Sequence, residues 1–156
     1  MRRSDREITD IRSILGILDR CDICRIALCD NNVPYVIALN YGVEVNSGAV
    51  SVYFHCAREG RKLDIIGRNN HACLEADRML GLVDAEKACG FTAKYESVMA
   101  FGRIFIVGDN SEKAHGLGVL MKKYAPSREF SFFGSELNSV TVLRMDVESI
   151  TGKSNI

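Results

Sequence analysis

The sequence predicts a mainly β protein: a barrel of antiparallel strands, about five to seven in number, with a few peripheral helices. Short apolar runs recur along the chain and are separated by turn residues, without the strand–helix alternation of a parallel sheet. The last long run, residues 141–150, alternates apolar and charged side chains as a half-buried strand does. Only two long segments repeat apolar residues at helical spacing.

The N-terminal half is expected to contain one helix followed by a meander of strands. Ser4 and Glu7 match a capping box, and apolar residues then repeat at helical spacing, which predicts a helix over about residues 5–19. Three apolar runs separated by two polar turns follow this helix. The strands predicted from these runs cover residues 23–29, 34–45 and 49–54.

The C-terminal half is expected to add a short helix, three strands and a second long helix. Helical spacing over about residues 114–124 ends before Pro126, which cannot continue a helix. Gly102 lies inside a predicted strand, where glycine often marks a bulge, a bend or the close approach of a ligand. The predicted strands cover residues 72–76, 97–107 and 141–150, and a loop is expected over residues 81–90.

Composition is typical of a globular chain of one domain, which we expect to cover residues 1–156. Of these residues 47% are hydrophobic and 26% are charged, and 20 basic residues balance 20 acidic ones. A formal net charge of zero argues against nucleic-acid or anionic-membrane partners. The N-terminus is charged, and no apolar run approaches the roughly 20 residues that span a bilayer. A cytoplasmic location is therefore expected.

The six cysteines are interpreted as reduced and buried rather than as disulfides or metal ligands. Cys21 and Cys24 have the spacing of half a zinc knuckle, but no second pair supplies the remaining ligands, so no metal site is expected. Neighbouring strand residues point to opposite faces, so His55 and Cys56 cannot pair directly. His71 and Cys73 would share a face, but no feature of the sequence marks the thiol as activated.

A basic, glycine-containing turn is the most informative segment. An apolar run ends at His55, and Arg58, Gly60, Arg61 and Lys62 precede a short helical pattern. A strand, a basic turn and a helix start bring backbone N–H groups and cationic side chains together on an anion. The turn therefore indicates a phosphorylated cofactor, with a solvated surface turn as an equally supported alternative.

His71 has two interpretations. It is either a polar residue at a strand entry, or a general acid or base, because imidazole changes charge near neutral pH.

Four blocks of the chain stand out in order: PYVIALNYG, VYFHCAREGRKLDIIGRNN, YESVMAFGRIFIV and VTVLRMDVESITGK. In sequence and in order they resemble the FMN-binding proteins related to pyridoxamine 5′-phosphate oxidase, and most closely the 5-nitroimidazole resistance branch. This resemblance implies a split β-barrel and a homodimer with FMN at the subunit interface.

The resemblance also implies a set of site residues. Arg61 and Lys62 fall on the basic pair that binds the FMN phosphate, and residues 35–40 would run beside the flavin ring. Ser97 stands where the oxidase has a glutamine. His71 matches the proposed catalytic histidine of the nitroimidazole branch, with Asn70 in place of the usual proline. The implied FMN-binding residues are Tyr35, Val36, Ile37, Ala38, Leu39, Asn40, Phe54, His55, Arg61, Lys62, Ser97 and Val98.

The sequence departs from the oxidase in ways that bear on function. Tyr35 and Asn40 replace an arginine and a lysine of the oxidase, and the sequence stops near Lys153, before the segment that contacts pyridoxal phosphate there. Oxidation of pyridoxamine phosphate is therefore not expected. The resemblance implies an FMN-dependent oxidoreductase that passes electrons from NAD(P)H to a small, nitroaromatic-like acceptor. The alternative is a non-enzymatic flavin-binding protein, or a heme protein in which His55 or His71 is the axial ligand.

Overall fold

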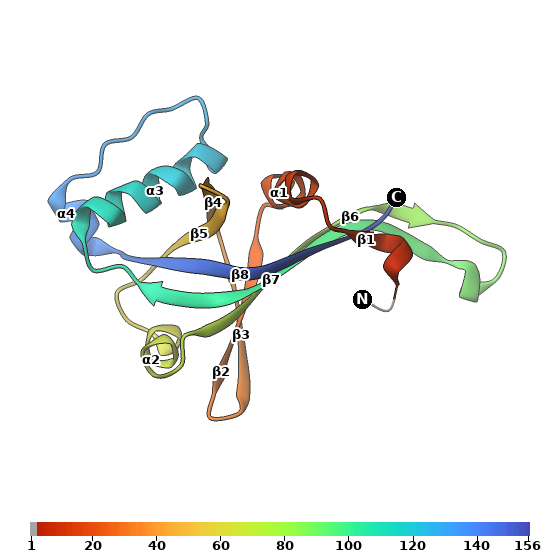
Figure 1. The fold of residues 1–156 in the computed structure, drawn as a ribbon, viewed down its shortest axis with the longest axis horizontal. Coiled ribbons are helices and arrows are strands. Elements are labelled where there is room, and N and C mark those ends of the chain that lie inside the picture. Colours follow the sequence, from red (N-terminus) through yellow and green to blue (C-terminus); the bar gives the residue numbers. More distant parts are fainter. Residues whose placement is uncertain (1–2) are drawn as a thin grey trace.

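Three long antiparallel strands form the centre of the fold (Figure 1). The computed structural model describes residues 3–156. These central strands are β6 (His71–Val83), β7 (Thr92–Ile106) and β8 (Thr141–Asn155). The β6–β7 hairpin extends beyond the rest of the sheet (Figure 1).

Two hairpins widen the sheet on either side of the central strands. β2 (Cys24–Asp30) and β3 (Val33–Leu39) lie beyond β6, whereas β5 (Ala49–Cys56) and β4 (Tyr41–Asn46) lie beyond β8. The strand order is β3-β2-β6-β7-β8-β5-β4, and the short β1 (Glu7–Ile8) pairs with β8. β3 and β4 follow each other in the chain yet lie at opposite edges. The mainly β class and the antiparallel sheet with peripheral helices are therefore confirmed, and the arrangement is that of a split barrel.

The helices cover the openings and edges of this sheet. α1 (Ile11–Arg20) lies beside the central strands, α2 (Arg61–Arg68) near β2, and α3 (Asn110–Tyr124) over β4 and β5 (Figure 1). The minor helices are η1 (Ser4–Arg6), η2 (Ala88–Gly90) and α4 (Gly134–Ser139). Among the helices of residues 3–156, none has the length and apolar character that a membrane crossing requires.

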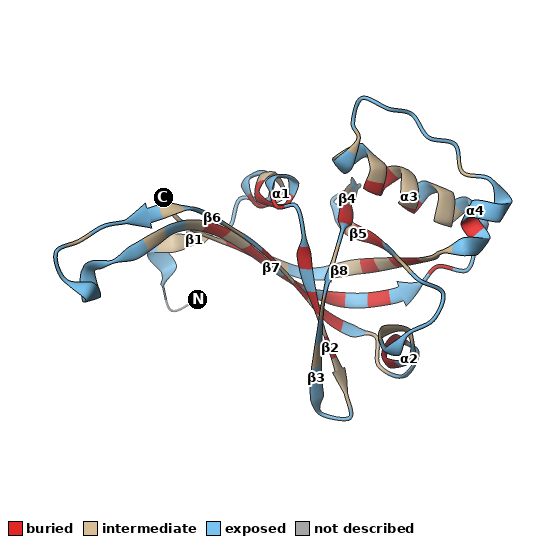
Figure 2. Ribbon diagram, turned by 180° about the vertical axis from the view of Figure 1, so that it is seen from behind, coloured by how far each residue is buried: buried red, intermediate tan, exposed pale blue. Residues whose placement is uncertain are grey.

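The core lies inside the barrel, where alternate strand residues meet one face of α1 (Figure 2). Ile14 and Leu18 of α1 pack on this core, and Ile26, Phe54 and Leu143 enter it from three different strands. A smaller cluster lies under α3. The predicted alternation of β8 holds over its middle, where Leu143 and Met145 are buried and Arg144 and Asp146 are not, but Val142 is buried as well.

Several predicted boundaries were wrong. α1 begins after Asp10, whose carboxylate accepts a hydrogen bond from the Ser13 N–H at 2.8 Å, so the capping box at Ser4 does not start it. The run over residues 34–45 is two strands broken at Asn40, and the two do not pair, so the predicted meander is incorrect. β6 continues to Val83, into the predicted loop. Over residues 3–156 the sheet has eight strands rather than five to seven, and α4 was not predicted.

Gly102 occupies a bulge, one of the three roles that its place in the strand suggested. The register between β7 and β8 shifts at Phe101 and Gly102, so that β8 contributes one extra residue, Glu148. A Cβ atom on Gly102 would lie 2.0 Å from the Asp146 carbonyl oxygen. Glycine is required because this approach leaves no room for a side chain.

Tyr41 joins the barrel to the end of α1. Its side chain is fully buried, and its hydroxyl is 2.6 Å from the Leu18 carbonyl oxygen and 3.1 Å from that of Cys21. The ammonium of Lys123 also donates to the Leu18 carbonyl and lies 4.1 Å from the Tyr41 ring centroid. These groups satisfy carbonyls that the last turn of a helix leaves without partners. Burial raises the pKa of Tyr41, so the phenol stays protonated.

We expect the Tyr41→Phe variant to lower the free energy of unfolding by about 1–2 kcal/mol, because it removes the hydroxyl from buried carbonyls. Urea denaturation measures this change. Tyr95→Phe is the matched control, since Tyr95 lies at the sheet surface near Lys153 and is expected to have little effect. Equal midpoints for Tyr41→Phe and the wild type would contradict the role assigned to this hydroxyl.

Candidate functional site

The basic turn leads from β5 into the first turn of α2. Gly60 precedes the helix with φ of 143°, a conformation that favours glycine, and its carbonyl accepts a hydrogen bond from the Leu63 N–H at 2.9 Å. No side chain caps the helix start. The first N–H groups of α2 therefore have no side-chain acceptor, and Arg61 and Lys62 stand beside them.

Arg61 belongs to a charged cluster that joins α2 to the β2–β3 hairpin. Its guanidinium carbon lies 5.0 Å from the Tyr35 ring centroid, and its Nη2 lies 3.8 Å from Asp30 Oδ2. Arg68, at the other end of α2, donates from Nη2 to Asp30 Oδ1 at 2.8 Å. These ion pairs do not involve Lys62, a partly exposed residue, so among the described residues its ammonium has no carboxylate partner. Within residues 3–156, Lys62 and the exposed Arg58 are therefore the two cations of the turn that form no ion pair.

β3 presents the predicted flavin-binding segment at an edge of the sheet. Within residues 3–156 it pairs only with β2, so the backbone groups on its other side are left for another partner. Tyr35, Ile37 and Leu39 pack against the core, while Val36 and Ala38 are exposed on the opposite face. The edge can thus offer N–H and C=O groups to a planar ligand, as the resemblance implies.

His71 lies at the rim of a cavity of about 310 Å³ on the outer face of the sheet. The cavity combines an aromatic surface, from the half-exposed Phe101, with the imidazole of His71 and the carboxylate of Glu148. Such a mixture of apolar surface and a few polar groups is typical of a small-molecule site. The cavity is lined by Ala27, Leu28, Cys29, His71, Ala72, Cys73, Phe101, Gly102 and Glu148.

Two asparagines before His71 hold the start of β6 in place. Asn69 accepts a hydrogen bond from the His71 N–H at 3.2 Å and donates to the Cys29 carbonyl, also at 3.2 Å. The Asn70 carbonyl accepts from the Ile104 N–H at 2.9 Å. Asn69 and Asn70 therefore connect the end of α2 to β2 and β7, directly before His71. The sequence did not predict that Asn69 would hold the start of β6. The only indication was the presence of a polar residue just beyond the end of α2.

The basic turn and the His71 cavity are neighbours at one end of the β2–β3 hairpin. Asp30 contacts the two arginines of α2, and the preceding residue, Cys29, lines the cavity. Ser97, by contrast, pairs with Asp77, six positions along β6 from His71. Six residues of a strand span about 20 Å. One chain therefore brings Arg61 and His71 together but leaves Ser97 at a distance.

The remaining predicted residues differ in what they can offer a ligand. The side chains of Phe54 and Val98 are buried in the core, so only their backbone atoms could meet a cofactor. His55 is exposed at the end of β5. Asn40, between β3 and β4, is also exposed.

The six cysteines are free thiols that differ in burial. All six are free, but only Cys21 and Cys24 are buried, and Cys89 is exposed, so the expectation of six buried thiols was wrong in part. Burial raises the pKa of Cys73, which lines the His71 cavity, and raises that of Cys24 to about 12. Neither is therefore a thiolate at neutral pH.

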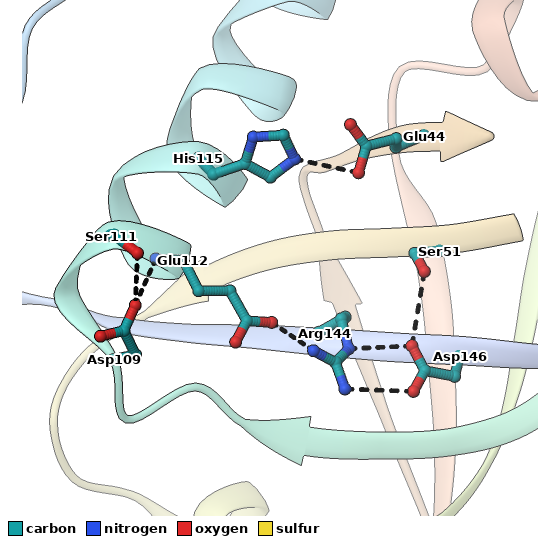
Figure 3. A network of polar contacts seen from close by, with 8 residues as sticks. All are labelled: Glu44, Ser51, Asp109, Ser111, Glu112, His115, Arg144 and Asp146. Atoms are coloured by element: carbon teal, nitrogen blue, oxygen red, sulfur yellow. Dashed lines mark hydrogen bonds and ion pairs between the residues drawn. The ribbon is translucent and has the colours of Figure 1, made fainter. Parts of the chain in front are cut away.

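A second polar cluster joins α3 to the neighbouring strands (Figure 3), and none of its residues lines the His71 cavity. Arg144 donates from Nε to Asp146 Oδ1 at 2.9 Å and also to Glu112, and His115 Nε2 lies 2.9 Å from Glu44 Oε2. A cavity of about 470 Å³ lies nearby, between α1, β4 and α3. This cavity is larger than the His71 cavity. However, the ammonium of Lys123, which lines it, already donates hydrogen bonds to the Leu18 and Asp19 carbonyls of α1. We therefore place the candidate site at His71.

Comparison with known proteins agrees with this geometry. A family profile described as pyridoxamine 5′-phosphate oxidase matches residues 10–154. The chain belongs to this family. The assignment confirms the resemblance found in the sequence blocks. No match is found among curated proteins.

Three solved structures are similar to this chain. A candidate 5-nitroimidazole antibiotic resistance protein from Bacteroides thetaiotaomicron is 30% identical, with a TM-score of 0.80 over 94% of this chain and 85% of that one. The flavocytochrome Anf3 from Azotobacter vinelandii has a TM-score of 0.83 at 23% identity, over 100% and 72% of the two chains. An FAD- and heme-binding protein from Mycobacterium smegmatis has 0.84 at 17%, over 96% and 73%. The last two show likeness of fold.

Proposed function

We propose that this protein is an FMN-dependent oxidoreductase that transfers electrons from NAD(P)H to a small, nitroaromatic-like acceptor. The observation that carries the proposal is the juxtaposition of a basic helix start with the His71 cavity through Asp30 and Cys29. The 30% identity to a candidate 5-nitroimidazole resistance protein supports an acceptor of this class.

The residues of the turn fit a terminal phosphate. Lys62 offers an ammonium without a carboxylate partner, and the uncapped start of α2 offers backbone N–H groups. Arg61 is tied loosely, with 3.8 Å between its Nη2 and Asp30, so its guanidinium can turn toward a phosphate oxygen. Tyr35, under Arg61, would orient that guanidinium.

The flavin ring would lie along the edge of β3. Unpaired backbone groups of residues 35–40 would meet its polar edge, and Phe54, His55, Ser97 and Val98 complete the implied contacts. FMN, when bound, would supply the hydride and electron-transfer chemistry. The chain's own part is to hold the acceptor against this ring and to provide a proton from the His71 imidazole to the reduced product.

A homodimer is part of this proposal. One face of the sheet exposes large apolar side chains, among them Val36, Met99 and Phe101, which are 57%, 43% and 50% exposed. Exposed apolar surface of this kind marks interaction sites. A second copy would also supply a Ser97 to a site from which this chain's own Ser97 is distant. Light scattering should give the mass of two chains, and the mass of one would remove the interface from the proposal.

Steady-state turnover tests the enzymatic function. The FMN-loaded protein should oxidise NADH or NADPH in the presence of a nitroaromatic or quinone acceptor. No turnover with any pair of donor and acceptor would contradict the enzyme. Flavin storage or delivery would then be the better account. Heme would be the ligand to test next, because two structural neighbours are a flavocytochrome and an FAD- and heme-binding protein.

A further inference from the structure

Arg103 stands next to His71 on the outer face of the sheet. The two residues are direct partners in the register between β6 and β7. Directly opposed residues of antiparallel strands point to the same face, with Cβ atoms about 5 Å apart. Phe101, two positions before Arg103, lines the His71 cavity from that face. Arg103 is not itself a lining residue, but it lies beside His71 and its guanidinium contacts Glu148, which lines the cavity.

The bulge at Gly102 brings an acidic side chain to this guanidinium. Glu148 is the extra residue of β8, and it lines the same cavity as His71. Its Oε1 accepts a hydrogen bond from Arg103 Nε at 3.2 Å. Asn70 Oδ1, from the segment that holds His71, accepts from Arg103 Nη1 at 3.3 Å. Both contacts orient the guanidinium, and a bulge is a common means of aiming a side chain beside a site.

The contacts leave Arg103 able to bind something else. A guanidinium has five N–H donors, and these two hydrogen bonds use two of them. The side chains of Arg103 and Glu148 are 46% and 58% exposed. Ion pairs this exposed contribute little to stability, so a ligand with two oxygens in a plane can displace Glu148 at small cost.

We propose that Arg103 recognises a nitro or carboxylate group on an aromatic acceptor held beside His71, and that Glu148 occupies the guanidinium in the absence of this ligand. The inference rests on the proposed function and narrows its substrate class. A nitro group and a carboxylate both present two coplanar oxygens that match the guanidinium fork, with a full negative charge on the carboxylate and partial negative charge on the oxygens of the neutral nitro group. The carboxylate of Glu148 would then compete with the acceptor for Arg103.

Equilibrium binding of 4-nitrobenzoate to the purified protein, measured by calorimetry, tests the proposal without requiring turnover. Arg103→Gln should raise the Kd about tenfold or more, because a charge-assisted hydrogen-bond pair is lost. Arg103→Lys should fall between this variant and the wild type. Glu148→Gln should lower the Kd, because the competing charge is gone. Arg25→Gln is the matched control, since Arg25 pairs with Glu75 and Asp77 farther along the same face.

Turnover gives an independent measurement. The ratio of kcat/KM for 4-nitrobenzoate to that for menadione, a quinone without either group, should fall about tenfold in Arg103→Gln. Weaker binding in both Arg103→Gln and Glu148→Gln would indicate a purely structural ion pair and overturn the proposal, as would an unchanged Kd in Arg103→Gln. Absence of nitrobenzoate binding to the wild type would overturn it too. Binding that depends on Arg103 without any turnover would instead contradict the proposed function alone.

Discussion

Replacing His71 with alanine should leave FMN binding intact and lower turnover of a nitro acceptor about a hundredfold or more. A positioned general acid typically contributes a factor of this size, and His71 is the imidazole at the rim of the cavity beside the basic turn. The side chain is exposed, and its backbone N–H is held by Asn69, so the substitution removes the imidazole without opening a void in the core. Stopped-flow measurement of flavin reoxidation by the acceptor isolates the affected step.

His115→Ala is the matched control for this prediction. His115 is also an exposed histidine, but it lies on α3 and contacts Glu44 (Figure 3), and neither residue lines the His71 cavity. Its substitution should leave acceptor turnover near the wild-type value. Wild-type kinetics in His71→Ala would reduce His71 to a polar residue at a strand entry. Loss of FMN from that variant would instead make the histidine a cofactor contact.

Replacing Lys62 with alanine should weaken FMN binding by about 1.5–3 kcal/mol, which corresponds to about 10- to 150-fold in Kd. Among the described residues the Lys62 ammonium has no carboxylate partner, so its loss removes a contact to the ligand rather than a contact within the protein. Quenching of flavin fluorescence on titration measures the change.

Riboflavin separates the phosphate contact from general damage to the site. It has the flavin ring but no phosphate, so its affinity should be the same in Lys62→Ala and in the wild type. Lys122→Ala, on the exposed side of α3, controls for the change in net charge. If FMN affinity is unchanged in Lys62→Ala, or if riboflavin affinity falls equally, Lys62 does not bind the phosphate.

Local pattern was sufficient for the elements whose side chains alternate clearly. β8 could be predicted because the buried Leu143 and Met145 alternate with charged residues, and α3 because its buried residues recur at helical spacing. Asn40 could not be recognised as a break between strands, because the apolar pattern continues through it to Tyr41 and the turn depends on barrel closure. The end of β6, from Met79 to Val83, has no core to pack against, so its periodicity is weak.

The candidate site, like the fold, could be predicted from the sequence only in part. The basic turn and His71 carry recognisable chemistry in the sequence, and the resemblance assigned roles to both. Their connection could not be predicted, because it depends on contacts between distant residues: Asp30 with Arg68, and Asn69 with Cys29. The place of Glu148 beside Arg103 also depends on a register shift between β7 and β8, which no single strand reveals.

The visible absorbance spectrum of the purified protein during titration with FMN tests the central claim most directly. The basic helix start and the free edge of β3 predict a flavin spectrum that saturates at one FMN per chain, with binding weakened in Lys62→Ala. A protein that shows a heme Soret band and no saturable change with FMN would contradict the account.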